Sequence, residues 1–215
     1  MRAPSWIAVT AIAAMSWAGA AGALDVAITP TIDTVETLHQ GETVTIQRNQ
    51  NTQHRVDPYF TYTSRECPPF CIQPAQVAPG VETVAELEVL DALRRIGEGA
   101  EDVLVVDSRT AQWPRRAMIP GAVNVPWTSL DPEQAEPEAV GAILRDTFGA
   151  VHRDGAWDFG PAKTLVLYCN GMWCAQSNSM VVSLLRYGYP AAKLKWYRGG
   201  MQNWSNVGLT TVRLR

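Results

Sequence analysis

The sequence predicts an α/β protein with a mainly parallel central sheet flanked by helices, preceded by a small β-rich N-terminal extension. Three observations support this class. From Val81 onward, short apolar runs alternate with amphipathic helical patterns, and such alternation favours a parallel sheet covered by helices. The apolar runs are continuous, which is typical of strands buried on both faces. Before Val81 the chain is more polar and rich in Thr and Val, which favours short strands and turns.

These patterns divide the chain into three parts. We assign residues 1–23 to a signal peptide, residues 24–80 to an N-terminal extension with a β-hairpin and a Pro/Cys clasp, and residues 81–215 to the α/β domain. The 215 residues suffice for one core plus an extension. A net charge of −3 gives no indication of binding to nucleic acid or to an anionic membrane surface. No cofactor is predicted.

The first residues have the pattern of an export signal. Arg2 gives a short positive region, an apolar run follows from Trp6 to Ala18, and small residues offer cleavage after Ala20 or Ala23. The run is short for a membrane span, and an uncleaved N-terminal anchor is the alternative. We therefore expect an exported protein without stable membrane insertion after cleavage, located in the periplasm if the source is a Gram-negative bacterium.

The extension begins with a predicted hairpin. The stretch "TVETLHQGETVTIQRNQ" reads as two short strands that turn near Gly41, with Val44 and Ile46 on one face. His39 and His54 fall in this region. Each is predicted to be a surface residue rather than a ligand, because neither has a metal-type partner nearby in the sequence.

The clasp, residues 62–80, is rich in proline and cannot continue a strand or a helix. Cys67 and Cys71 lie in it, and a local disulfide between them would be a structural staple, with a redox role as the alternative. Cys169 and Cys174 form a second close pair. Export and an even cysteine count favour disulfides. A four-thiolate zinc site is the competing interpretation, but these spacings fit zinc poorly and no metal is predicted.

The α/β domain is predicted to begin with a helix. Thr83 and Glu86 form a capping box, and Gly97 and Gly99 end the helix. Its apolar positions are Val84, Leu87, Leu90, Leu93 and Ile96. Three buried strands and three further helices follow. The strands are predicted at residues 102–109, 164–169 and 193–200, and the helices at residues 132–150, 177–189 and 201–208.

Cys169 stands directly after a predicted buried strand and just before a helix. Ligands of open parallel sheets bind beyond the carboxyl ends of the strands. The peptide N–H groups of residues 170–176 are placed to curl around the sulfur, and the helix presents its positive end, so the thiolate is favoured. The same N–H groups would hold an anionic product, and Gly171 permits a tight loop. A small cysteine that packs inertly at a strand end is the alternative.

Three ordered motifs resemble the rhodanese family of sulfurtransferases and their relatives. The first is "VVDSRTAQWPRRAMIPGAVNVPW", which ends in a signature similar to I-P-G-A-x-N-x-P at residues 119–126. The second is "LVLYCNGMWCAQS". The third, "WYRGGMQNWSNVGLTTV", is similar to G-G-x-x-x-W-x-x-x-G at Gly199, Gly200, Trp204 and Gly208. The resemblance covers about residues 82–212 and implies the α/β fold described above.

The resemblance implies roles for several residues. Cys169 matches the catalytic cysteine, which would accept a sulfur atom from a donor, form a persulfide and pass the sulfur to a nucleophilic acceptor. Asp107 and Arg109 match the D-x-R at the end of the first core strand. We interpret Asp107 as a structural hydrogen-bonding residue. Arg109 either attracts an anionic substrate or is a solvated surface residue. Trp204 is best explained by core packing.

The loop after Cys169 departs from the family pattern. It is two residues longer than the common form, and Gln176, or Cys174 in another register, stands where the family has Arg or Lys. Met118 replaces the usual His. Because one charge-assisted hydrogen bond contributes about 1 to 3 kcal/mol, the missing cation argues against efficient use of thiosulfate. The substrate-binding residues implied are Asn170, Gly171, Met172, Trp173, Gln176, Ser177 and Arg109.

Cys174 gives the loop a second thiol. We predict that it acts with Cys169 by attacking a persulfide or mixed disulfide, which leaves an oxidised pair; a permanent staple is the alternative. The leading hypothesis is an exported sulfurtransferase or sulfane-sulfur carrier, whose partners are a small sulfur-containing substrate or a thiol acceptor. A thiol–disulfide redox protein and a non-catalytic module that binds a partner protein in the cell envelope are the competing hypotheses.

Overall fold

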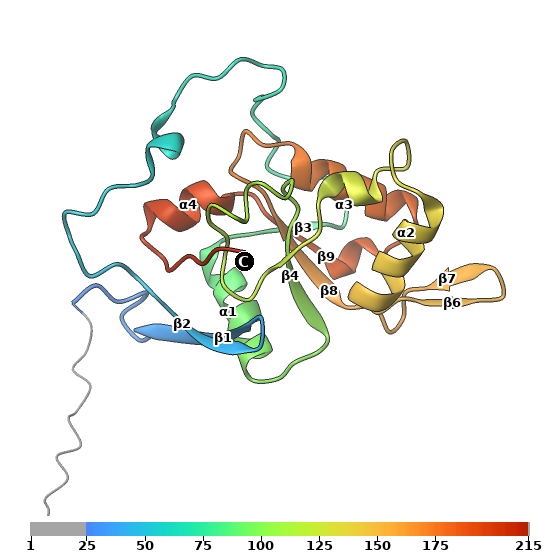
Figure 1. The fold of residues 1–215 in the computed structure, drawn as a ribbon, viewed down its shortest axis with the longest axis horizontal. Helices are drawn as coiled ribbons and strands as arrows, with labels where there is room; N and C mark the ends of the chain where they lie inside the picture. Colours follow the sequence, from blue (N-terminus) through green and yellow to red (C-terminus); the bar gives the residue numbers. More distant parts are fainter. Residues whose placement is uncertain (1–24, 215) are drawn as a thin grey trace, which may run out of the picture.

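The computed structural model describes residues 25–214 of the chain (Figure 1). The predicted signal peptide, residues 1–23, lies outside the described residues. Within the described part, no helix combines the length and the apolar character needed to cross a bilayer.

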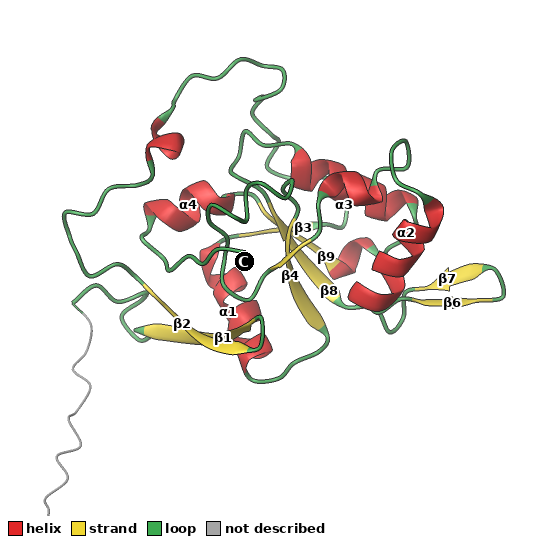
Figure 2. Ribbon diagram, in the orientation of Figure 1, coloured by secondary structure: helices red, strands yellow, loops and turns green. Residues whose placement is uncertain are grey.

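Five parallel strands form the central sheet in the order β3-β9-β8-β4-β5 (Figure 2). The strands are β3 (Glu82–Val84), β4 (Val103–Asp107), β5 (Val123–Asn124), β8 (Thr164–Tyr168) and β9 (Leu194–Tyr197). The helices are α1 (Glu86–Gly97), α2 (Pro137–Ala142), α3 (Gln176–Arg186) and α4 (Gly200–Asn206). The predicted α/β class and parallel sheet are confirmed.

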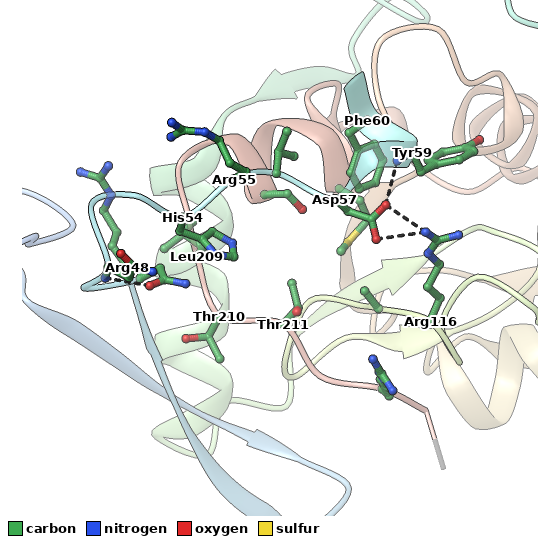
Figure 3. A pocket seen from close by; sticks show the side chains of 18 of the residues that line it. Arg48, His54, Arg55, Asp57, Tyr59, Phe60, Arg116, Leu209, Thr210 and Thr211 are labelled. Carbon is green, nitrogen blue, oxygen red and sulfur yellow. Dashed lines mark hydrogen bonds and ion pairs between the residues drawn. The ribbon is translucent and has the colours of Figure 1, made fainter. Parts of the chain in front are cut away.

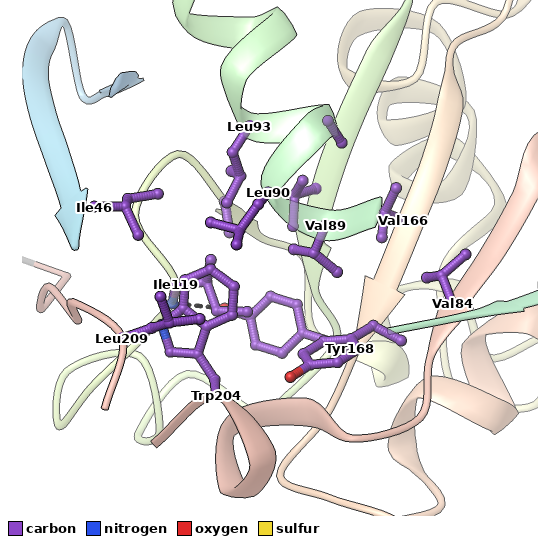
Figure 4. Packing of buried hydrophobic residues seen from close by; sticks show 14 of the residues in the cluster. Ile46, Val84, Val89, Leu90, Leu93, Ile119, Val166, Tyr168, Trp204 and Leu209 are labelled. Carbon is purple, nitrogen blue, oxygen red and sulfur yellow. Dashed lines mark hydrogen bonds between the residues drawn. The ribbon is translucent and has the colours of Figure 1, made fainter. Parts of the chain in front are cut away.

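Helices cover both faces of the sheet, with α1 and α4 on one face and α2 and α3 on the other (Figure 1). Side chains alternate between the faces along each strand. Strand β8 therefore gives Val166 and Tyr168 to the core under α1, and Leu165 and Leu167 to the core under α3. Trp204 of α4 is fully buried in the first of these cores, as predicted (Figure 4).

Helix α1 begins two residues later than predicted. Thr83 lies in β3, which pairs with β9, and the predicted capping box of Thr83 and Glu86 is wrong. Instead, the Glu88 carboxylate accepts a hydrogen bond of 2.9 Å from the N–H of Ala85. Leu87, predicted to face the core, is 52% exposed. The edge of β9 offers unpaired backbone groups, and pairing with them draws the preceding residues into a strand.

The extension forms the predicted hairpin, made of β1 (Thr34–His39) and β2 (Glu42–Gln47). Its turn includes Gly41 at φ 83°, a conformation that glycine adopts without steric cost. Val35 and Ile46 pair across the hairpin and are buried in the core under α1. The hairpin and the α/β domain therefore share one hydrophobic core.

Two glycines of the domain allow the hairpin to approach closely. A side chain at Gly97 would place its Cβ 2.4 Å from the carbonyl oxygen of Glu36. At Gly121 the Cβ would lie 2.6 Å from Oγ1 of Thr37. Both distances are below any real contact, so only glycine fits between α1, the turn after Ile119 and β1.

Some elements differ from the predicted ones, because short or polar stretches give only weak patterns in the sequence. The helix predicted at residues 132–150 is reduced to α2 and a π-helical turn, Ile143–Thr147. Pro137 explains its late start, since proline fits only the first turn of a helix. Strand β5 was not predicted, nor was the outlying hairpin of β6 (Val151–Arg153) and β7 (Ala156–Asp158).

His39 is half-buried at the end of β1, so the prediction of a surface histidine is wrong there, while His54 is exposed as predicted. The N–H of Gly121 donates a hydrogen bond of 3.3 Å to Nδ1 of His39. Burial lowers the pKa of His39, because desolvation disfavours the charged imidazolium. The neutral ring is therefore the form that supports docking of the hairpin.

Acidification should destabilise the protein through His39. In the unfolded chain the imidazole of His39 has a pKa of about 6.5, whereas in the folded chain this pKa is lower. The free energy of unfolding should therefore fall as the pH drops through about 6.5 and level off below the folded pKa. Urea unfolding at about pH 7.5 and 5.5 measures the effect. His39→Asn keeps an acceptor without titrating and should show a smaller decrease. An equal decrease would contradict this role.

Candidate functional site

The loop that holds Cys169 and Cys174, residues 169–175 and called the thiol loop below, lies at the carboxyl edge of the central sheet. Strand β8 ends at Tyr168, Cys169 follows it, and α3 begins at Gln176. Tyr168 pairs in register with Asp107, the last residue of β4. Because the carboxyl ends of parallel strands meet at one edge, the D-x-R segment and the thiol loop are brought together.

A buried ion pair supports this edge. Asp107 is fully buried and Arg109 is 2% exposed. The Arg109 guanidinium donates from Nε to Oδ1 of Asp107 at 2.8 Å and from Nη2 to Oδ2 at 2.6 Å. Tyr168 donates its hydroxyl to the same carboxylate at 2.9 Å. The alternative of a solvated Arg109 is therefore wrong.

The charges of this network are firmly fixed. Burial alone would lower the pKa of Arg109, but hydrogen bonding and attraction to Asp107 outweigh it and the pKa is raised. Burial, together with the neighbouring carboxylate of Asp107, raises the pKa of Tyr168 well above its ordinary value. Asp107, interpreted from the sequence as a structural residue, accepts all three of these side-chain hydrogen bonds.

Arg109 connects the network to the thiol loop. Its Nη1 donates to Oδ1 of Asn170 at 2.9 Å, and its Nη2 donates to the carbonyl of Ala117 at 2.7 Å. Asn170 was predicted to bind substrate, but its amide oxygen faces this buried guanidinium and the residue is 2% exposed. The contact fixes the first residue of the loop after Cys169.

Helix α4 also holds the loop, through two backbone hydrogen bonds. The N–H of Met201 donates to the carbonyl of Cys169 at 3.0 Å, and the N–H of Gln202 donates to that of Asn170 at 2.8 Å. Gly200 makes this approach feasible. At its φ of 55° a Cβ would lie 2.4 Å from the carbonyl oxygen of Cys169. The second glycine of the pair in the third motif is thus explained by the contact of α4 with the thiol loop.

Cys169 and Cys174 form a disulfide across the loop, with Cα atoms 6.1 Å apart. Their exposed fractions are 2% and 7%. Sγ of Cys169 lies 3.9 Å from Oε1 of Gln176, so Gln176 stands beside the sulfur. Ser177 is buried below the loop, where its Oγ accepts a hydrogen bond of 3.0 Å from the indole of Trp196.

Several backbone donors of the loop remain available. The N–H of Cys174 donates to the carbonyl of Gly171 at 2.9 Å, which closes the loop on itself. Among residues 25–214, none accepts a hydrogen bond from the N–H groups of Gly171, Met172 or Trp173. Such consecutive free donors are the groups that bind anions in backbone nests.

The extension covers the loop with an arginine set among aromatic rings. The guanidinium carbon of Arg65 lies 4.2 Å from the ring centroid of Trp173 and 4.5 Å from that of Tyr59. Phe70 contacts Trp173 edge-on, with the centroids 5.7 Å apart. Trp173, predicted to contact substrate or a partner protein, therefore packs against the chain's own extension.

Hydrogen bonds fasten the clasp beside these rings. The N–H of Gln73 donates to the carbonyl of Met172 at 2.8 Å, and Asn178 of α3 donates its side-chain amide to Oε1 of Gln73 at 3.0 Å. Arg198 donates to the carbonyls of Gln73 and Pro74. Met172 itself remains 37% exposed at the rim of the loop.

Cys67 and Cys71 form the predicted local disulfide in the clasp, with Cα atoms 4.6 Å apart. The four cysteines thus form two separate disulfides in this structure, each within one of the close pairs. Within residues 25–214, no group of three or more His, Cys, Asp or Glu side chains is placed to hold a metal. The sequence did not indicate that Arg65 and Phe70 reach the thiol loop, because nothing in their spacing encodes so distant a contact.

Comparison with known proteins identifies the family of this chain. The family model described as "Rhodanese-like domain" matches residues 89–207. No curated protein matches the chain.

Solved structures resemble the chain only distantly. A thiosulfate sulfurtransferase from Pseudomonas aeruginosa is 18% identical over 63% of this chain and 21% of its own, with a TM-score of 0.40. A rhodanese from E. coli is 18% identical over 52% of this chain and 99% of its own, with a TM-score of 0.33. A protein of unknown function from Rhodopseudomonas palustris, described as a possible tyrosine phosphatase, is 22% identical over 63% of this chain and 88% of its own, with a TM-score of 0.40.

Gly200→Ala should destabilise the protein by about 2 kcal/mol or more, because it adds both backbone strain and a clash with the Cys169 carbonyl. Gly155→Ala is a matched control, since Gly155 also has a positive φ but nothing within 4 Å of its Cβ position. Chemical unfolding measures the free energy of unfolding of both variants. The loss should be larger for Gly200→Ala by at least about 1 kcal/mol. Equal losses would show that the approach of α4 to the loop is not tight.

Proposed function

Because the chain belongs to the rhodanese-like domain family, we propose that it is a sulfurtransferase that carries sulfane sulfur as a persulfide on Cys169. The position of Cys169 is the observation that supports this most. It lies at the carboxyl edge of the sheet, in a loop with three consecutive free N–H groups. Such donors favour a thiolate over a thiol and stabilise a charged persulfide.

The cycle starts by reduction of the disulfide between Cys169 and Cys174. Two thiol groups of an external reductant supply two electrons and two protons and become a disulfide themselves. The Cys169 thiolate then attacks the outer sulfur of a donor such as thiosulfate. The S–S bond of the donor breaks, and sulfite leaves with the bonding electron pair. Cys169 now carries one additional sulfur atom.

Two nucleophiles compete for this persulfide. An acceptor thiolate can attack the outer sulfur and take it, and the Cys169 thiolate then leaves. Alternatively, the Cys174 thiolate attacks Sγ of Cys169, hydrosulfide leaves, and the disulfide is restored. With thiosulfate, the second route converts one donor and two reductant thiols to sulfite, hydrogen sulfide and one disulfide.

The extension supplies the charge that the loop lacks. No Lys or Arg stands between Cys169 and Ser177. Arg65 lies on Trp173 of the loop, and its buried Nε has no hydrogen-bond partner among the described residues. This guanidinium would attract an anionic sulfur donor toward the loop. Met172, Trp173 and Gln176 would then line the path of the donor to the sulfur.

Thiol–disulfide exchange is the second candidate function, and the disulfide between Cys169 and Cys174 favours it. In this case the pair would exchange electrons directly with partner thiols, and no persulfide would form. We propose the same location for both activities, outside the cytoplasm and in the periplasm of a Gram-negative source. The N-terminal signal pattern and the two disulfides support export.

Reduced protein incubated with thiosulfate or polysulfide should gain one sulfur atom on the peptide that contains Cys169. The gain should be clearest in Cys174→Ser, which cannot expel the sulfur. Intact-mass and peptide mass spectrometry measure it, after the reductant has been removed. Cys169→Ser is the negative control, and the double variant Cys67→Ser/Cys71→Ser should behave like wild type. If Cys174→Ser never acquires sulfur but wild type cycles reversibly between dithiol and disulfide, the redox candidate replaces the sulfurtransferase.

Release of hydrogen sulfide should depend on Cys174. With a persulfide on Cys169 and no added acceptor, wild type should release sulfide while re-forming the disulfide. Cys174→Ser should release it at least about tenfold more slowly, because the thiolate that attacks Sγ of Cys169 has been removed. A sulfide-specific electrode follows the reaction. Equal rates in the two proteins would exclude Cys174 as the resolving thiol.

A further inference from the structure

A large cavity lies between the extension and the α/β domain, beside the thiol loop but separate from it. Its volume is about 850 Å³, and none of residues 169–177 lines it. Its walls come from the segment after β2, the segment that includes Arg109 and Arg116, and the C-terminal residues that follow α4 (Figure 3).

The lining of this cavity is strongly positive, although the whole chain has 18 Lys and Arg against 21 Asp and Glu. Five arginines and one carboxylate, Asp57, line it. The arginines are Arg48, Arg55, Arg109, Arg116 and Arg213. A concentration of one sign of charge in a hollow of a net negative protein raises the local concentration of ligands of the opposite sign.

Two of the five cations are already neutralised. Arg109 is paired with the buried Asp107, and Nη2 of Arg116 donates to both oxygens of Asp57 at 2.9 and 3.1 Å. The N–H of Tyr59 also donates to Asp57 at 2.8 Å. The only carboxylate among the lining residues is therefore fully occupied.

Three cations remain unmatched. Within residues 25–214, no carboxylate lies within 4 Å of a nitrogen of Arg48, Arg55 or Arg213. Arg48 donates from Nε to the carbonyl of Val207 at 2.8 Å, which holds its side chain in place without neutralising it. The cavity thus has three positive charges in excess of its own acids.

The unmatched arginines lie near the two ends of one extended segment, residues 209–213. Arg48 forms a β-bridge with Leu209, and Val212, next to Arg213, forms one with Met118. The four steps from Leu209 to Arg213 span up to about 13 Å at the rise of an extended chain. In Figure 3, Arg48 lies at one side of the view and Arg116 at the other, and the segment with Thr210 and Thr211 runs between these two sides.

Part of the cavity lining between these arginines is apolar. Phe60, Met201 and Leu209 contribute to it, and Leu209 is 6% exposed. In liquid water each molecule takes up roughly 30 Å³, so a cavity of about 850 Å³ has the volume of about thirty water molecules. An inorganic ion would therefore leave most of the cavity unfilled. Cavities of about 300 to 1,000 Å³ are typical of sites for small organic molecules, which polar groups in the lining orient.

We propose that this cavity binds a small organic dianion, with an apolar body over Leu209 and acidic groups held by Arg48 and Arg55 at one end and by Arg213 at the other. The site lies next to the sulfur chemistry without taking part in it. Met201 lines the cavity and donates its N–H to the carbonyl of Cys169. The cavity therefore borders a residue that holds the thiol loop.

Terephthalate is a suitable probe, because it has two carboxylates on a rigid apolar ring. Isothermal titration of the mature protein should give a submillimolar dissociation constant that weakens with added salt. The neutral analogue terephthalamide should not bind measurably, and benzoate should bind at least about tenfold more weakly. Cys169→Ser should bind terephthalate as well as wild type does, which separates this site from the proposed sulfur transfer.

Arg55→Gln and Arg213→Gln should each weaken terephthalate binding by about fivefold, the effect of losing one partly solvated charge contact. Both side chains are exposed, so the fold should be retained, and thermal unfolding checks this. Arg153→Gln is the matched control, since Arg153 is an exposed arginine of β6 outside the cavity. The proposal is overturned if terephthalate fails to bind, if terephthalamide binds equally well, or if the control variant weakens binding as much as the two cavity variants.

Discussion

The buried ion pair of Asp107 and Arg109 is the interaction on which the rest of the site depends. A guanidinium that is 2% exposed is stable only when its charge is matched and its donors are used. Arg109 meets this condition by reaching Asp107, Asn170 and the carbonyl of Ala117. Removing one partner of such a pair typically costs about 3 to 5 kcal/mol. The ends of β4 and β8 and the start of the thiol loop are therefore fixed together.

Helix α4 and the ion pair both act on the first residues of the loop. Backbone N–H groups of α4 bind the carbonyls of Cys169 and Asn170, while the Arg109 guanidinium binds the side chain of Asn170. The loop is thus held at its beginning, and Cys174 closes it. The N–H groups in between remain directed to no protein acceptor among the described residues. A rigid loop with free donors suits a reaction in which negative charge stays on sulfur.

The extension is part of the site rather than an addition to it. Its hairpin shares the core under α1 through Val35 and Ile46, and its clasp packs Arg65 and Phe70 on Trp173. The extension therefore brings a positive charge to a loop that has no Lys or Arg of its own. The same segment forms one wall of the cationic cavity, so one extension borders both proposed binding regions.

The sequence by itself determined the α/β class, the three main strands and the place of Cys169 between β8 and α3. Periodicity and glycine spacing are local properties, and they suffice for such elements. Edge pairing decided the start of α1, where Thr83 joined β9 instead of capping the helix. Only the tertiary structure placed Arg109 inside the protein and Arg65 on the thiol loop. Burial and long-range contact depend on which surfaces meet after folding, and no pattern within a short stretch of residues records that.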